Sequence, residues 1–266
     1  MYQTTYHRAS SVDEAASLFS KSSEAKFLAG GQTLLPVMKQ RLASPSDVID
    51  LAKIKDMIGV EASGDTLTIK AATPHYDVAT SDAAKKAIPA LAYLASLIGD
   101  PAVRYRGTIG GSLANNDPAA DYPAATLALG ATVKTNKRSI AADDFFKDLF
   151  TTALEDGEII TAVSFPVPQK AGYAKMPHPA SRFALTGVFV AQTKSGEIRV
   201  AATGASQSGV MRVPAIEAAL KANWSPSAID SVNISASGLL SDIHGSSDYR
   251  ANLVKVMAQR AVAAAG

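Results

Sequence analysis

The sequence predicts an α+β protein with a main body to about residue 168 and a smaller domain after it. Three observations predict this class. Short apolar strands alternate with amphipathic helical segments before residue 53, strand-like alternation is mixed with helical runs up to residue 168, and a passage rich in Pro, Gly and Lys at 169–182 precedes further strands and helices. We therefore expect domains at 1–168, with parts at about 1–53 and 54–168, and at 169–266.

The first part contains two predicted helices and two predicted strands. Residues 10–22 are amphipathic, and Ser11 is a suitable N-cap for a helix there. Residues 25–31 predict a strand that runs into a Gly-Gly turn, and residues 47–51 predict another short strand. The segment between them is typical of a helix from Leu34 onward, because its proline falls in the first turn.

The second part mixes strands and helices. Residues 58–78 alternate apolar and polar side chains around a Gly-Asp turn, which predicts a β-hairpin. Residues 82–99 predict a helix in two pieces, broken at Pro89. Residues 122–136 predict a helix, a glycine stop and a strand, and residues 156–168 predict a strand that ends at two prolines.

The smaller domain is predicted to begin with a hairpin and to end with helices. The hairpin covers residues 183–206, with Ser-Gly at its turn. Helical patterns follow at 213–223, at 225–232 and at 248–265. Asp248 is the predicted N-cap of the last helix.

The composition excludes several classes of function. The chain of 266 residues is 47% hydrophobic and 19% charged, with a formal charge of +2, so it offers no electrostatic basis for binding nucleic acid or an anionic membrane. It has no cysteine, which excludes disulfides, thiolate catalysis and cysteine-ligated metal centres on this chain. No secretory signal and no apolar run of membrane-spanning length is found. We expect a cytoplasmic protein without an integral membrane segment.

Two glycine pairs, Gly30-Gly31 and Gly110-Gly111, each follow an apolar run and precede small polar residues. Glycine permits positive φ and lets the backbone approach a ligand, and successive exposed N–H groups suit phosphate oxygens. A helix that begins just after each pair would add its positive end. One such pair more often marks an ordinary turn, and neither matches a Rossmann or P-loop motif. Two loops of the same chemistry, the second followed by Asp121, favour a pyrophosphate held from two sides.

The segments AGGQTLLPVMKQRL and IGDPAVRYRGTIGGSLANNDPAADYPAA resemble the FAD-binding medium subunit of the molybdenum hydroxylases, which include carbon monoxide dehydrogenase, xanthine dehydrogenase and aldehyde oxidase. YHRASSVDEAASLF, KAATPHYDV, DGEIITAVSFPVP and DYRANLVKVMAQRA extend the resemblance over nearly the whole chain. It implies a two-subdomain FAD-binding fold of the vanillyl-alcohol oxidase type. A small C-terminal α+β domain, with a three-stranded sheet plus helices, would follow.

The resemblance also implies a non-covalent FAD that lies extended between the two N-terminal subdomains. Asp121 would accept hydrogen bonds from ribose hydroxyls of the adenosine part, and Ile98 would lie against the isoalloxazine ring. Ile160 and Lys175 would flank the flavin, and the lysine would stabilise negative charge near the reduced ring or a phosphate. The cofactor-binding residues would be Ala29, Gly30, Gly31, Gln32, Thr33, Leu34, Ala72, Thr73, Ile98, Thr108, Gly110, Gly111, Ser112, Asn115, Asp121, Ile160 and Lys175.

The implied role is electron transfer, with no catalytic residue on this chain. A large subunit would oxidise substrate at a molybdenum cofactor. Electrons would pass through [2Fe–2S] clusters of a small subunit to this FAD and then to a terminal acceptor. A dimer of heterotrimers is the family expectation. The absence of cysteine excludes the family variant that carries an additional iron–sulfur cluster in this subunit.

Two alternatives stay open. The chain could be a cofactor-free scaffold or assembly subunit of the same fold, or a stand-alone FAD oxidoreductase. Intact glycine loops favour a flavoprotein over a scaffold. The lack of cysteine, and of histidine in either loop, argues against a covalent-flavin oxidase. The four histidines show no metal-ligand spacing, and no GxSxG motif indicates hydrolysis.

Overall fold

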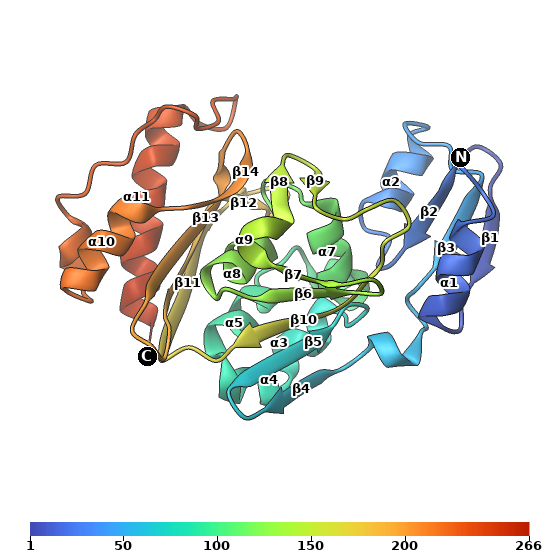
Figure 1. The fold of residues 1–266 in the computed structure, drawn as a ribbon. Coiled ribbons are helices and arrows are strands. Elements are labelled where there is room, and N and C mark those ends of the chain that lie inside the picture. The colour runs from blue at the N-terminus through green and yellow to red at the C-terminus, as the bar shows by residue number, and fades with distance from the viewer. Residues whose placement is uncertain (266) are drawn as a thin grey trace.

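The computed structural model of the protein describes residues 1–265, and it shows three β-sheet units arranged in a row (Figure 1). We name them the N-terminal unit (1–53), the central unit (54–168) and the C-terminal unit (169–265). The blue N-terminal unit and the orange-red C-terminal unit lie at opposite ends, and the central unit lies between them. The predicted α+β class is confirmed.

The N-terminal unit is a parallel three-stranded sheet in the order β1-β3-β2, with two helices. The predicted helix at 10–22 is confirmed as α1, and the Ser11 hydroxyl accepts a hydrogen bond from the Glu14 N–H as its N-cap. The sequence pattern did not predict β1, whose residues are mostly exposed. The elements are β1 (Thr5–Arg8), α1 (Val12–Phe19), β2 (Ala25–Leu28), α2 (Leu34–Lys39) and β3 (Asp47–Asp50).

The central unit contains an antiparallel five-stranded sheet in the order β4-β5-β10-β6-β7. The predicted hairpin and the helix broken at Pro89 are both confirmed. The strands are β4 (Val60–Ser63), β5 (Thr66–Lys70), β6 (Thr132–Thr135), β7 (Ser139–Ala141) and β10 (Ile160–Pro166), with a small hairpin of β8 (Phe146–Asp148) and β9 (Thr151–Thr152). The helices are the 3-10 turn η1 (Lys55–Met57), α3 (His75–Thr80), α4 (Asp82–Ala87), α5 (Pro89–Ser96), α6 (Pro101–Arg106), α7 (Ile109–Asn115), α8 (Tyr122–Ala128) and α9 (Ala142–Phe145).

The C-terminal unit corrects one prediction, because its antiparallel sheet has four strands rather than three. The additional strand β11 occupies the passage at 169–182 that the composition indicated as a boundary. Its proline, Pro177, is the last residue of the strand. A Cβ on Gly172 would collide with the Ala261 carbonyl, so this glycine permits the close approach of the last helix. The strands are β11 (Lys170–Pro177), β12 (Ala184–Gln192), β13 (Ile198–Ser206) and β14 (Gly209–Arg212).

The helices of this unit also differ in detail from the prediction. The helix at 213–223 is confirmed as α10 (Pro214–Ala222), but the segment at 225–232 forms only the 3-10 turn η2 (Pro226–Ile229). The last helix, α11 (Ser247–Ala264), begins before the predicted N-cap at Asp248. Its N-cap is Ser246, because the hydroxyl of this serine accepts a hydrogen bond from the Tyr249 N–H.

The C-terminal sheet contributes to two hydrophobic cores. Side chains of one face, such as Val188 and Val200, pack with α10 and α11. Side chains of the other face, such as Tyr173 and Phe189, belong to the same core as the central unit. The whole of α8 is buried against β12 and β13. The C-terminal unit therefore packs against the central unit through a shared core.

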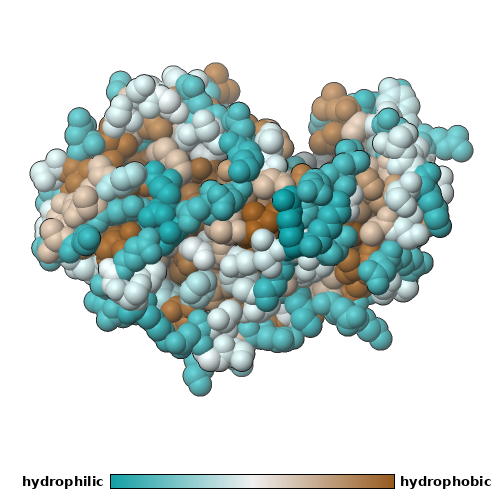
Figure 2. All heavy atoms as spheres, viewed as in Figure 1, coloured by the Kyte–Doolittle hydropathy of each residue, from teal (hydrophilic) through white to brown (hydrophobic). Residues whose placement is uncertain are grey.

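The surface mixes hydrophilic and hydrophobic residues, and its outline is notched between the N-terminal unit and the rest of the molecule (Figure 2). Within residues 1–265, no helix has the length and apolar character that a membrane span requires.

Candidate functional site

A cavity of about 650 Å³ lies where the three units meet. Its size is within the range of small-molecule and cofactor sites. Its walls come from the loop after β2, from the start of α7, from the loops around Ile98 and Ile160, and from residues 181–183 between β11 and β12. Segments that are far apart in the chain thus form one site.

The cavity wall contains all of the predicted cofactor residues except Thr73 and Lys175. Thr73 is buried outside it, and its hydroxyl accepts a hydrogen bond from the Gly59 N–H at 2.9 Å and donates one to the Gly59 carbonyl at 3.0 Å. The residues that line the cavity are Ala29, Gly30, Gly31, Gln32, Thr33, Leu34, Ala72, Ile98, Thr108, Gly110, Gly111, Ser112, Asn115, Asp121 and Ile160.

The loop between β2 and α2 provides free hydrogen-bond donors. Gly31 has a φ of 72°, a left-handed conformation that glycine adopts without steric strain. Within residues 1–265, the backbone N–H groups of Gln32, Thr33 and Leu34 donate to no protein acceptor. Three consecutive N–H groups at a cavity wall are suited to an anion such as a pyrophosphate.

The second glycine pair behaves differently from the prediction. Gly110 and Gly111 lie inside the first turn of α7, after the N-cap Thr108, rather than in a loop before it. The Gly110 N–H donates to the Ala71 carbonyl at 2.9 Å, and the Gly111 N–H donates to the Thr108 hydroxyl at 3.1 Å. These two N–H groups are therefore already paired, so Ser112 and Asn115 are the polar side chains that this wall offers.

The glycines instead let the walls approach each other closely. A Cβ on Gly110 would lie 2.6 Å from the Cβ of Ala71, which is too close for any side chain. A Cβ on Gly30 would collide with the Arg106 carbonyl, and one on Gly111 would lie 3.4 Å from the Cβ of Ala29. The loop of the first glycine pair therefore packs closely against Arg106 and Gly107, which precede α7.

Asp121 and Lys175 form a buried ion pair beside the cavity. The Lys175 ammonium lies 2.9 Å from Asp121 Oδ1, and both side chains are only 4% exposed. Lys175 also donates to the carbonyls of Leu97 and Arg182, and the Tyr173 hydroxyl donates to Asp121 at 2.5 Å. Burial raises the pKa of Asp121, although Lys175 and Tyr173 act in the opposite direction. Lys175 does not itself line the cavity, but its hydrogen bonds connect three segments of the cavity wall, at Leu97, Asp121 and Arg182.

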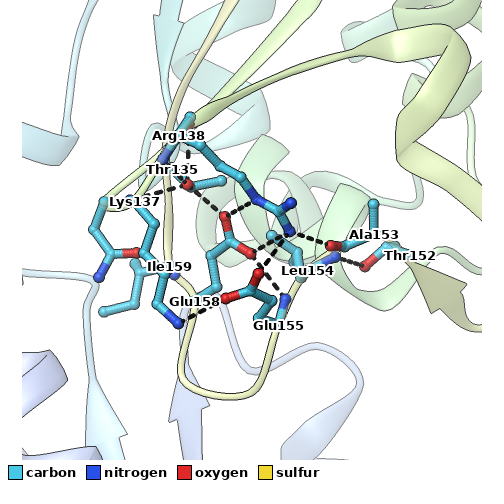
Figure 3. A network of polar contacts seen from close by, with 10 residues as sticks. Thr135, Lys137, Arg138, Thr152, Ala153, Leu154, Glu155, Glu158 and Ile159 are labelled. Atoms are coloured by element: carbon cyan, nitrogen blue, oxygen red, sulfur yellow. Dashed lines mark hydrogen bonds and ion pairs between the residues drawn. The ribbon is translucent and has the colours of Figure 1, made fainter.

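A polar network fixes the loop before β10, which forms another part of the wall (Figure 3). The buried Glu158 carboxylate accepts hydrogen bonds from Arg138 at 3.0 and 3.1 Å, from the Thr135 hydroxyl at 2.7 Å and from the Glu155 N–H at 2.8 Å. The hydrogen bonds from Arg138, the largest effect, lower the pKa of Glu158 to about 2. Glu158, which is ionised at physiological pH, thus helps to hold the loop that includes Leu154 and Ile159 at the cavity.

Sequence reasoning did not identify His75 as a site residue, although it lies in the KAATPHYDV segment. Its side chain lines the cavity and is only 5% exposed. Burial, together with the charge of Arg104, lowers its pKa to about 3, so the imidazole is neutral at physiological pH. Position within a resembling segment was the only signal in the sequence that could have indicated it.

The described residues contain no group of three or more His, Asp or Glu side chains that could hold a metal ion. The arrangement instead combines free N–H donors at one wall with apolar residues at another. Such a cavity suits an elongated organic cofactor with an anionic middle.

Comparison with known proteins agrees with this geometry. The family described as "FAD binding domain in molybdopterin dehydrogenase" matches residues 2–168. The nicotine 6-hydroxylase medium subunit of Paenarthrobacter nicotinovorans is 35% identical over 98% of this chain and 96% of its own. The carbon monoxide dehydrogenase medium chain of Afipia carboxidovorans is 35% identical over 97% of this chain and 94% of its own.

Solved structures give the same result. Carbon monoxide dehydrogenase from Hydrogenophaga pseudoflava matches with a TM-score of 0.85 and 34% identity over 98% of this chain and 96% of its own. Quinoline 2-oxidoreductase from Pseudomonas putida 86 matches with a TM-score of 0.82 and 28% identity over 98% and 96%. The predicted FAD-binding fold is confirmed by these structures. The chain belongs to the family of FAD-binding medium subunits of molybdopterin-dependent dehydrogenases.

Proposed function

We propose that this chain binds one FAD non-covalently in the cavity between its three units and transfers electrons as one subunit of a molybdenum hydroxylase complex. The free N–H groups of Gln32, Thr33 and Leu34, placed in the wall of a cofactor-sized cavity, are the observation that carries this proposal. When bound, FAD supplies the redox chemistry, and the protein orients and tunes it.

The residues around the cavity fit the parts of FAD. The three N–H groups, with Ser112 and Asn115 across the cavity, bind the pyrophosphate. Ala72 and Ile98 give an apolar wall for the flavin ring, and Ile160 lies at the neighbouring loop. Asp121 accepts from ribose hydroxyls with its remaining lone pairs. Lys175 acts through Asp121, because it is outside the cavity wall.

The partners follow from the relatives, two of which are named as the medium subunit or medium chain of a dehydrogenase or hydroxylase. We infer a large subunit with the molybdenum cofactor and a small subunit with [2Fe–2S] clusters, assembled as a dimer of heterotrimers in the cytoplasm. Electrons reach the FAD of this chain from the clusters and leave to a terminal acceptor. In this proposal residues 1–168, in parts 1–53 and 54–168, are the FAD-binding domain, and residues 169–266 are the C-terminal flavoprotein domain.

The test is FAD binding by the purified chain, followed by visible absorption after desalting and by the thermal shift at saturating FAD. Ser112→Leu fills the cavity wall and should abolish retention. Ser208→Leu, at an exposed serine of the turn between β13 and β14, is the matched control and should retain flavin. If the wild-type chain neither retains FAD nor is stabilised by it, the scaffold alternative is correct. Substrate oxidation by this chain alone would support the stand-alone oxidoreductase instead.

A further inference from the structure

His75 is a polar side chain in the cavity wall without a partner in the protein. Its backbone is fixed, since its N–H donates to the Gly107 carbonyl at 2.8 Å. Its Nδ1 is buried and has no hydrogen-bond partner within residues 1–265. Its Nε2 lies beside Gly107, another wall residue, because a Cβ there would be 2.6 Å from this nitrogen.

A buried imidazole without a partner is unfavourable for folding alone. Leaving a buried polar group unpaired costs about 1–3 kcal/mol, whereas an apolar side chain of similar shape would avoid that penalty. The neighbours do not relieve it. The Tyr122 ring centroid lies 5.3 Å from that of His75, but the Tyr122 hydroxyl is itself unpaired, and the Arg104 guanidinium donates to the carbonyls of Ile98 and Gly99. Nδ1 is buried, so Nε2, which also has no hydrogen-bond partner among residues 1–265, is the nitrogen with which a ligand in the cavity could pair.

The surroundings of His75 indicate which part of a ligand it meets. Ala72, Ile98, Val103 and Gly107 line the cavity with His75 and bring no side-chain charge to it. Such a wall suits a planar, uncharged ring with hydrogen-bonding edges, and not a phosphate. The free N–H groups that suit a phosphate belong to the loop between β2 and α2.

We propose that His75 is a positioning residue for the cofactor, and that its Nε2 hydrogen-bonds the isoalloxazine ring of FAD. The proposal rests on the proposed function, because it assigns one contact within the FAD site. A neutral imidazole is suitable here, since it orients the ring without adding charge beside it. The pKa of about 3 keeps His75 neutral throughout the physiological range.

The experiment compares the wild-type chain with His75→Phe, His75→Gln and Tyr122→Phe. Phenylalanine keeps a planar ring and removes both nitrogens, and glutamine restores a polar group at similar reach. Tyr122→Phe is the matched control, because it removes the other unpaired polar atom of this pair at a residue outside the cavity wall. Each protein is titrated with FAD to obtain a Kd, the visible band of the bound flavin is recorded, and the apo chain is melted.

We expect His75→Phe to weaken FAD binding about tenfold, which corresponds to one hydrogen bond of about 1.4 kcal/mol, and to shift the visible flavin band. The apo chain should melt no lower than the wild type. His75→Gln should recover most of the affinity, and Tyr122→Phe should keep both affinity and band.

Three results overturn the proposal. If His75→Phe changes apo melting but neither Kd nor band, His75 is a structural core residue. If the Kd weakens while the band is unchanged, His75 contacts another part of FAD. If the wild-type chain binds no FAD, the proposed function has failed and this inference fails with it, which is a distinct outcome from failure of the His75 variants alone.

Discussion

Lys175→Met is predicted to destabilise the chain strongly, with a loss that grows with pH. The substitution leaves the buried Asp121 carboxylate without its cationic partner and removes the donor to the carbonyls of Leu97 and Arg182. Removing one partner of a buried ion pair costs about 3–5 kcal/mol. Methionine keeps a similar length, so little of the loss should come from a cavity.

The pH dependence follows from Asp121. Its pKa is already raised by burial, and Lys175 is the largest influence that lowers it, so Lys175→Met raises the pKa further. A carboxyl whose folded pKa exceeds its unfolded pKa loses stability as pH rises through the folded value. At low pH Asp121 of the variant is neutral and needs no cationic partner. The loss of stability is then only the cost of leaving the carbonyls of Leu97 and Arg182 unpaired, about 1–3 kcal/mol.

The assay is urea unfolding of wild type and variant from pH 4 to pH 8. Lys194→Met is the matched control. Its ammonium lies 2.5 Å from Asp65, but both side chains are exposed, at 51% and 75%, so no measurable loss is expected. Asp121→Asn combined with Lys175→Met should recover part of the stability. A loss for Lys175→Met that is small, or that is the same at every pH, would refute the reasoning.

Three further predictions concern the cavity wall. The free energy of unfolding of the wild type should fall by roughly 1.4 kcal/mol per pH unit on acidification from pH 6.5 to about 3, because in this range His75 is protonated in the unfolded state but not in the folded state. His75→Phe should flatten this dependence in urea unfolding. Gly110→Ala should lower stability by about 1–3 kcal/mol through overpacking against Ala71, as melting would show. Gly111→Ala, whose Cβ would lie 3.1 Å from the Thr108 hydroxyl, should lower stability less and should weaken FAD binding in a titration. Glu158→Gln should lower the melting temperature above pH 4.5, and the difference from the wild type should shrink toward pH 2. An equal loss at pH 4.5 and at pH 2 would contradict the ionised state assigned to Glu158.

Much of the fold could be predicted from local patterns. The capped helix after Ser11, the hairpin and the break at Pro89 depend on neighbours in the sequence, and all three are confirmed, although the hairpin ends at Lys70 and the last residues of the predicted segment 58–78 belong to α3. The strand β11 could not be predicted, because its Gly172 is explained by the close approach of α11, which is distant in the sequence, and its proline by a position at the end of the strand. Tertiary packing outweighed composition there.

The site shows the same limit. The glycine segments identified the cavity, since nearly all predicted residues line it. Their roles were not predictable, because the pairing of the Gly110 N–H with the Ala71 carbonyl depends on which strand lies beside α7. Lys175 was predicted to flank the flavin, and its ion pair with the cavity residue Asp121 could not be predicted, because the two residues are far apart in the sequence. His75 became a candidate only when burial showed it without a partner.

The shared sheet of the C-terminal unit has a consequence for how this protein can be divided. A fragment ending at residue 168, where the family match stops, would lose Tyr173 and Phe189 from the central core and expose the buried helix α8 to water. The segment that the family model matches is therefore not expected to fold by itself. A chain split between residues 168 and 169 should therefore be unstable, whereas insertions should be tolerated at exposed turns such as the one at Ser195.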